Sequence, residues 1–135
     1  MAVRQITTKL TVDGEQEFKR QLSAVNRELG NLGAEMKLVD AQFKGQANSA
    51  EALREKQRIL SEEVANSENK VKALEEALKE ATAAYGEGDA RVDKYQKSLL
   101  TAQRQLVETN RALDDTTKYL KEAEASADGC ATSID

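Results

Sequence analysis

The stretch that decides the fold is FKRQLSAVNRELGNLGAEMKLVDAQF, residues 18–43. Its apolar side chains recur at alternating spacings of four and three residues. The series is Phe18, Leu22, Val25, Leu29, Leu32, Met36, Val39 and Phe43. This seven-residue repeat is typical of a helix that buries one stripe against another helix. The stretch therefore predicts a long helix.

The residues on either side give this helix its predicted limits, 14–44. Asp13 with Gln16 three positions later is typical of a helix start, and Gly45 suits a helix end. Inside the stretch, Gly30 and Gly33 each cost about 1 kcal/mol relative to alanine. They predict a soft or closely packed spot.

A second heptad series predicts a helix over 50–85, with Ser49 as its N-cap. The apolar seam of this helix is Leu53, Leu60, Val64, Val71, Leu74 and Leu78. Polar Gln57 and Ser67 occupy seam positions, where they are expected to weaken the seam and fix its register. Gly86, Gly88 and Asp89 then predict a turn and a further cap.

A third helix is predicted over 90–125, with a single apolar row that returns every seven residues. The row is Val92, Leu99, Leu106, Leu113 and Leu120. The positions four residues after each of its first four members are polar: Gln96, Gln103, Asn110 and Thr117. We therefore expect Leu100 and Val107, at the flank of the row, to supply a second contact.

Both ends of the chain differ from this pattern. Residues 4–12, within an N-terminal arm of residues 1–13, place Ile6, Thr8, Leu10 and Val12 on one face, which predicts a short strand. Its free edge is expected to pair with another chain, with Ile6, Leu10 and Val12 as the candidate residues. An extended or disordered arm is the alternative. Residues 126–135 are small and polar, which indicates the flexible end of a fragment.

These elements predict an all-α fold with a short N-terminal strand and three long heptad-patterned helices in one elongated coiled-coil domain, residues 14–125. The chain has no proline, the residue that most strongly interrupts helices. Short connections favour antiparallel helical hairpins. The alternative is that the same seams pair between chains, as a homo-oligomer.

Composition excludes several kinds of chemistry. Histidine is absent, so no catalytic Ser-His or Cys-His pair and no His-ligated metal site is available. Cys130, the only cysteine, lies among small and acidic neighbours, which do not activate a thiol. Gly86 and Gly88 lack the Lys-Ser/Thr of a phosphate loop. We expect no enzyme activity, no catalytic or metal-binding residue and no cofactor.

Charge patterning argues against two classes of partner. The formal net charge is −4, and acidic and basic residues are interleaved, as on solvated helix faces. Nucleic-acid binding would need a clustered basic surface, and membrane binding a basic face with tryptophan. Neither partner is expected for this segment, and no run of apolar residues is long enough to span a membrane.

The order of pieces nevertheless resembles the N-terminal region of tail tape measure proteins of long-tailed bacteriophages and prophages. The resemblance covers essentially the whole chain, and its most specific part is KLVDAQFKG, residues 37–45. It continues through ALREKQ at 52–57 and YGEGD at 85–89. The heptads alone would not discriminate, because many coiled coils share them.

This resemblance implies a structural virion protein that sets tail length and scaffolds assembly of the tail tube. It implies self-association, as a trimer or hexamer, and contact with the tail tube protein and with tail assembly chaperones. The protein would lie in the virion tail and, during assembly, in the bacterial cytoplasm. Tape measure proteins run to many hundreds of residues, so we expect this chain to be an N-terminal fragment, folded as an end domain. The alternative is a cytoplasmic coiled-coil adaptor, or a chaperone-like hairpin, that binds partner helices.

Overall fold

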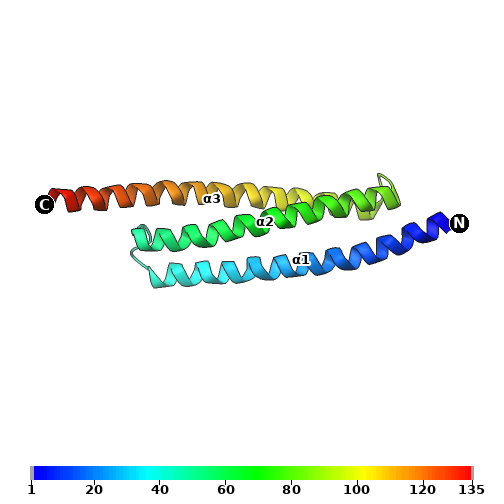
Figure 1. The fold of residues 1–135 in the computed structure, drawn as a ribbon, viewed down its shortest axis with the longest axis horizontal. Helices are drawn as coiled ribbons and strands as arrows, with labels where there is room; N and C mark the ends of the chain where they lie inside the picture. The colour runs from blue at the N-terminus through cyan, green and yellow to red at the C-terminus, as the bar shows by residue number, and fades with distance from the viewer. Residues whose placement is uncertain (1, 135) are drawn as a thin grey trace. The chain divides into compact units, whose positions relative to one another are not determined.

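A computed structural model describes the backbone of residues 2–134 and the side chains of residues 14–125. Three helices follow one another: α1 (Ala2–Gln42), α2 (Ala50–Tyr85) and α3 (Ala90–Ile134) (Figure 1). The all-α class with three helices is confirmed. The predicted N-terminal strand is not supported, because residues 1–13, with Ile6, Leu10 and Val12, lie outside the part described in full. The cap at Asp13 and the thiol of Cys130 also lie outside it.

The first turn, between α1 and α2, is built from backbone hydrogen bonds and a side-chain cap. Gly45 adopts a φ of +84°, a conformation that residues with a Cβ rarely take. The N–H of Gln46 donates to the carbonyl of Phe43 at 2.8 Å. The hydroxyl of Ser49 accepts a hydrogen bond from the N–H of Ala52 at 3.2 Å, so the predicted N-cap of α2 is confirmed.

The second turn, between α2 and α3, uses two glycines. Gly86 and Gly88 have φ values of +86° and +88°, and the N–H of Gly86 closes the end of α2 by donating to the carbonyl of Thr82 at 2.9 Å. The carboxylate of Asp89 then accepts a hydrogen bond from the N–H of Arg91 at 2.9 Å. The predicted cap of the third helix is thus confirmed, and the glycines serve the turn.

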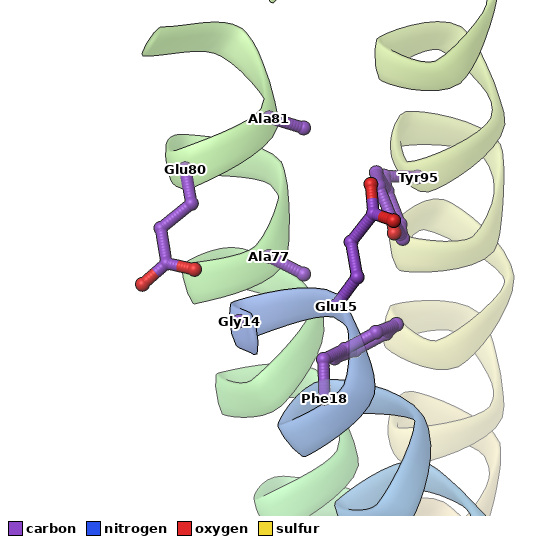
Figure 2. A pocket seen from close by; sticks show the side chains of 7 residues that line it. All are labelled: Gly14, Glu15, Phe18, Ala77, Glu80, Ala81 and Tyr95. Carbon is purple, nitrogen blue, oxygen red and sulfur yellow. The ribbon is translucent and has the colours of Figure 1, made fainter. Parts of the chain in front are cut away.

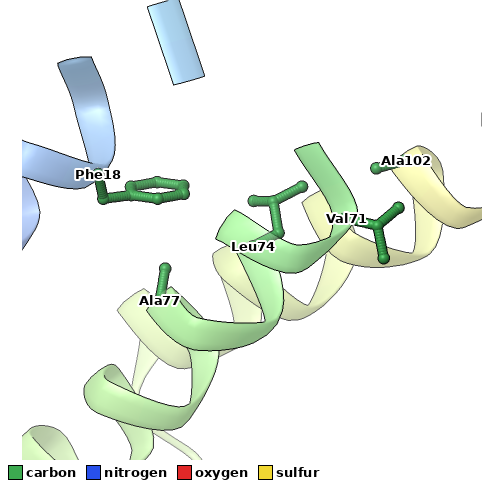
Figure 3. Packing of buried hydrophobic residues seen from close by; sticks show 5 residues of the cluster. All are labelled: Phe18, Val71, Leu74, Ala77 and Ala102. Carbon is green, nitrogen blue, oxygen red and sulfur yellow. The ribbon is translucent and has the colours of Figure 1, made fainter. Parts of the chain in front are cut away.

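The chain divides into two compact units, each containing segments of all three helices. Unit 1 comprises residues 1–28 and 66–106, and unit 2 comprises residues 29–65 and 107–135. The core of unit 1 is a cluster of Phe18, Val71, Leu74, Ala77 and Ala102 (Figure 3). Because α2 supplies three of these five side chains, its segment is the centre on which α1 and α3 pack in this unit.

The core of unit 2 forms between α1 and α2. Leu32, Val39 and Ile59 are buried together, with Met36 and Phe43 packed against them. The segment of α3 joins this unit through a polar contact, in which the Gln57 amide donates to the Thr117 hydroxyl at 3.1 Å. A seam glutamine was predicted to fix register, and here it has a specific partner.

Side chains of the predicted seam face inward throughout the described residues. Those fully buried are Phe18, Leu32, Val39, Leu53, Leu60, Val71, Leu74, Val92 and Leu120. Those half-buried are Leu22, Val25, Leu29, Met36, Phe43, Val64, Leu78, Leu99, Leu106 and Leu113. None of them is exposed. The heptad pattern therefore located the inward stripe of each helix.

The second contact of α3 was predicted at the wrong positions. Leu100 is 63% exposed and Val107 is 55% exposed. The inward row instead lies three residues after each heptad leucine or valine, at Tyr95, Ala102, Thr109, Thr116 and Ala123. Small and polar side chains dominate this row, so a search for large apolar residues passes over it.

The two glycines inside α1 do not mark a closely packed spot. A Cβ built on Gly30 or on Gly33 meets no atom within 4 Å, and α1 is continuous through both.

Replacement of either of these glycines by alanine is expected to stabilise the protein by up to about 1 kcal/mol, because alanine restricts the unfolded chain and favours helix. Urea denaturation followed by circular dichroism measures the change. Gly45→Ala is the matched control and should destabilise, because of the positive φ at Gly45. A loss of stability in Gly30→Ala and Gly33→Ala would contradict the open space around them.

Candidate functional site

A groove opens in unit 1 between α1 and α3. It consists of two adjoining hollows of about 320 and 370 Å³ that share Leu22, Leu74 and Ser98 in their linings. Leu74, from α2, is 1% exposed and forms the apolar base. The groove therefore follows the line between α1 and α3, with Leu74 buried beneath it and the half-buried Leu22 and Tyr95 as its accessible apolar lining.

Lysines line both hollows of this groove. Lys19 and Lys94 line the first hollow, and Lys70 and Lys97 line the second. Among the residues whose side chains are described, none of these four forms an ion pair. Glu15 and Arg91 also line the first hollow, so the groove as a whole carries an excess of positive charge, which favours an acidic occupant.

One end of the groove is closed by an aromatic pair. The rings of Phe18 and Tyr95 meet edge to face, with centroids 5.4 Å apart, a favoured aromatic geometry. Beside them lies a cavity of about 20 Å³, which residues of all three helices line, among them Gly14, Glu80 and Tyr95 (Figure 2). That volume suffices for about one water molecule, so the cavity holds no larger ligand.

A polar cluster surrounds Tyr85 at this same end. The Tyr85 hydroxyl donates to the Glu15 carboxylate at 3.0 Å. The guanidinium of Arg91 lies 3.3 Å from the centroid of the Tyr85 ring, a cation–π contact, and is held there by Asp89 at 3.0 Å. Burial, followed by the hydrogen bond to Glu15, raises the pKa of Tyr85. The cluster therefore anchors the start of α3 to the end of α2 and to α1.

Asp89 has a strongly lowered pKa, about 2 instead of 3.8. The main cause is the hydrogen bond from the Arg91 side chain, followed by the bond from the Arg91 N–H. Because the folded pKa lies below the unfolded one, the stabilising contribution of Asp89 is complete above about pH 4 and is lost as the pH falls toward 2.

We expect an NMR titration of the Asp89 carboxyl carbon to give a midpoint near pH 2. The stability of Asp89→Asn should depend less on pH than that of the unmodified chain in this range, because asparagine does not titrate. The control is Asp93→Asn, which removes an exposed carboxylate one helical turn later in α3. A midpoint near 3.8 would contradict the cap and its ion pair.

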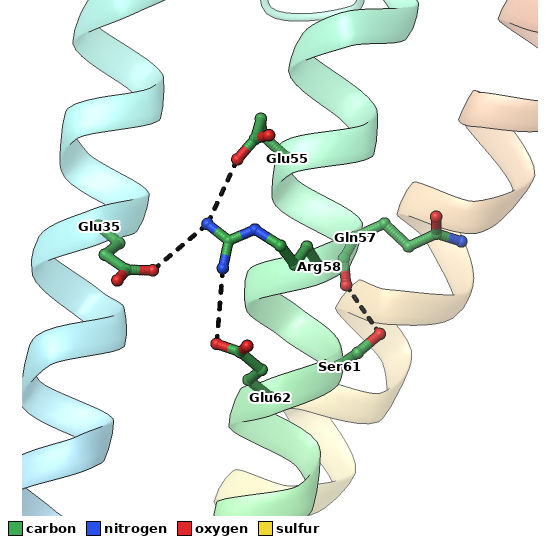
Figure 4. Close-up of polar contacts among 6 residues, drawn as sticks. All are labelled: Glu35, Glu55, Gln57, Arg58, Ser61 and Glu62. Carbon is green, nitrogen blue, oxygen red and sulfur yellow. Dashed lines mark hydrogen bonds and ion pairs between the residues drawn. The ribbon is translucent and has the colours of Figure 1, made fainter.

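A second polar cluster lies on the surface of unit 2. The Arg58 guanidinium contacts the carboxylates of Glu55, Glu35 and Glu62 at 3.3, 3.5 and 3.6 Å (Figure 4). All four side chains are about half exposed, where single ion pairs contribute little. The ion pair between Glu35 of α1 and Arg58 of α2 therefore adds little to stability.

The described residues hold no group of three or more His, Cys, Asp or Glu side chains that could bind a metal ion. Nor does any helix there have the length and apolarity needed to cross a membrane. The groove offers apolar contact and positive charge, together with the hydroxyls of Ser98 and Thr101.

Sequence reasoning missed two features of this surface. Tyr95, which closes the groove, stands outside the predicted leucine row of α3. The groove lysines come from all three helices, and only the packing of unit 1 brings them together. A usable signal for Tyr95 was its spacing, three residues after Val92, which places both on one helix face.

The comparisons with known proteins give no further assignment: no protein family, curated protein or solved structure matches this chain.

Proposed function

We propose that the chain is a non-catalytic structural segment of a phage tail protein, the N-terminal part of a tape measure protein that sets tail length and scaffolds tube assembly. The observation that carries the proposal is the burial of the heptad side chains along all three helices. A segment whose inward surface is a continuous helical seam is suited to a mechanical role. The resemblance of residues 37–45 supplies the particular class of protein.

Within that class, we propose an end domain whose helices fold back as coiled-coil hairpins. The support is the pair of turns, at Gly45 and at Gly86 and Gly88, whose positive φ values each end one helix and let the next begin within a few residues. The proposal includes self-association, as a trimer or hexamer, in the virion tail. Contacts with the tube protein and, in the host cytoplasm, with assembly chaperones follow from the resemblance.

Tail length in the phage or prophage that encodes the chain tests this proposal. We expect removal of residues 14–125 in frame from the complete protein to abolish tails of normal form. A plain ruler would instead give intact tails that are shorter by about 170 Å, at 1.5 Å per helical residue. Electron microscopy of negatively stained particles distinguishes the two results.

A matched control replaces the same residues with an unrelated, uninterrupted helix of the same number of residues. The control restores a plain ruler but does not restore an end domain. Tails of unchanged number, length and infectivity in the deletion would overturn the assignment to the tail.

The second candidate function is a coiled-coil adaptor that binds partner helices. The groove in unit 1 favours it, because the half-buried Leu22 and the lysines that line the groove offer an amphipathic helix apolar contact and positive charge. The genetic context separates the two functions. A tape measure protein requires a long open reading frame beside tail genes, whereas an adaptor functions as a short chain.

A further inference from the structure

We propose that residues 14–28 of α1 form a strap, which opens from unit 1 while the α2 and α3 segments of that unit stay paired. Phe18 anchors the strap in the core, and Gly30 and Gly33 form its hinge. The strap is a conformational device of the fold and does not rest on the assignment to a phage tail.

The strap contributes little to the core of unit 1. Phe18 is buried, Leu22 and Val25 are half-buried, and the side chains of residues 19–21, 23, 24 and 26–28 are exposed. The α2 segment of the same unit buries a longer series: Ser67, Val71, Leu74, Ala77 and Ala81. Because local stability follows the apolar contacts that a segment buries, the strap is held less firmly than the helix on which it lies.

Hollows flank the strap on both sides. Toward α3 lie the two hollows of the groove, of about 320 and 370 Å³. Toward α2 lies a third hollow of about 90 Å³, which Glu17 of the strap lines together with Glu76 and Glu80 of α2. No basic side chain among the described residues lines this third hollow. Missing contacts and repulsion between like charges therefore both weaken the hold of unit 1 on the strap.

Specific contacts of the strap are concentrated in its first turn. The Glu15 carboxylate accepts the hydrogen bond of the Tyr85 hydroxyl at 3.0 Å, and the Phe18 ring meets Tyr95 edge to face. Among the described residues, no side chain of residues 19–28 forms a hydrogen bond or an ion pair. One anchor and one polar latch therefore hold the whole strap.

Two glycines follow the strap at the point where a hinge is needed. Gly30 and Gly33 lie just beyond its last residue, in the α1 segment of unit 2. Packing does not require either glycine, because a Cβ at each meets no atom within 4 Å, and neither has a positive φ. Each weakens the helix relative to alanine, so α1 breaks most easily there.

Native-state hydrogen exchange of the 135-residue chain tests the strap. We expect the amides of residues 14–28 to be at least about tenfold less protected than the helical amides of residues 66–106, because an opening that leaves α2 and α3 paired exposes only the former. This comparison uses the unmodified chain, so it does not depend on whether a variant folds.

Leu99→Ala separates the strap from the rest of unit 1. Leu99 packs against the core cluster from α3 and lines neither hollow of the groove. The open form keeps the contacts between α2 and α3, so this substitution affects it as much as the closed form. Protection should therefore fall over residues 66–106 and stay unchanged over residues 14–28.

The double variant G30A/G33A tests the hinge. It should raise protection over residues 14–28 at least about fivefold, because alanine favours the unbroken helix of the closed form. Asn69→Ala, at an exposed position of α2, is the matched control. It should leave protection over residues 14–28 unchanged, because α2 stays helical in both forms.

Glu17→Lys tests the repulsion in the acidic hollow. Placing a positive charge beside Glu76 and Glu80 should raise protection over residues 14–28 about threefold at low salt, and added salt should reduce the gain. Glu28→Lys makes the same change in the strap at a position that lines none of the three hollows, and it should have no such effect.

Equal protection of residues 14–28 and 66–106 in the unmodified chain, or equal losses in both ranges from Leu99→Ala, would overturn the strap. Unchanged protection over residues 14–28 in G30A/G33A would overturn the hinge. Equal effects of Glu17→Lys and Glu28→Lys would overturn the role of the acidic hollow.

Discussion

Replacement of Leu74 by alanine is expected to lower the free energy of unfolding by about 3–5 kcal/mol. Leu74 is 1% exposed and packs among Phe18, Val71, Ala77 and Ala102 in the core of unit 1. The substitution removes apolar contacts and leaves a cavity, because the backbone of three packed helices closes only partly around the lost atoms. For a domain whose total stability is about 5–15 kcal/mol, the expected loss is a large fraction.

The matched control is the same substitution at Leu100, which is 63% exposed. Leu100→Ala should change stability by less than about 0.5 kcal/mol. Urea denaturation followed by far-UV circular dichroism measures both variants under one set of conditions. Similar losses at the two positions would mean that Leu100 is buried, as the sequence pattern led us to expect, and that α3 is rotated from its position in the structure.

This pair of residues shows where sequence reasoning succeeds. Leu74 belongs to an uninterrupted heptad series, and each member of that series confirms the phase set by its neighbours. The glycine turns and the caps at Ser49 and Asp89 were also readable, because each depends on a few adjacent residues. Fold class and inward stripes follow from such local patterns.

Sequence reasoning fails where the position of a neighbouring helix determines which side chains are buried. In α3 the large apolar residues define only one row of inward positions, so a second row could lie on either side of it. Leu100 and Val107 were chosen for their size, but the smaller Ala102 and Thr109 hold the inward positions. The groove could not be predicted for a related reason. Its lysines are far apart in sequence, and only the packing of the helices in unit 1 brings them together.

Ile59 illustrates the same limit on α2. A single stripe was predicted for this helix, yet α2 contacts both of its neighbours within a unit and therefore needs a second stripe. Ile59 is 0% exposed and packs against Leu32 and Val39 of α1 in unit 2. It stands one residue before Leu60, which the heptad pattern selected, so it lies outside the single predicted stripe.

We expect Ile59→Ala to lower the free energy of unfolding by about 2–5 kcal/mol, an effect that the single-stripe prediction would not allow. The size of the loss depends on how far Met36 and Phe43, which pack against the cluster, move into the vacated space. Leu38→Ala, in the same unit but 57% exposed, should change stability by less than about 0.5 kcal/mol.

Hydrogen exchange adds a readout that locates the loss. Because Ile59 contacts only unit 2 residues in its cluster, Ile59→Ala should reduce amide protection most over residues 29–65, and Leu74→Ala most over residues 66–106. Equal losses of protection in both ranges from either substitution would mean that the two units open together, so that the three helices form one cooperative structure. Separate losses would assign each core its own stability, and the unit that bears the groove could then open while the other stays folded.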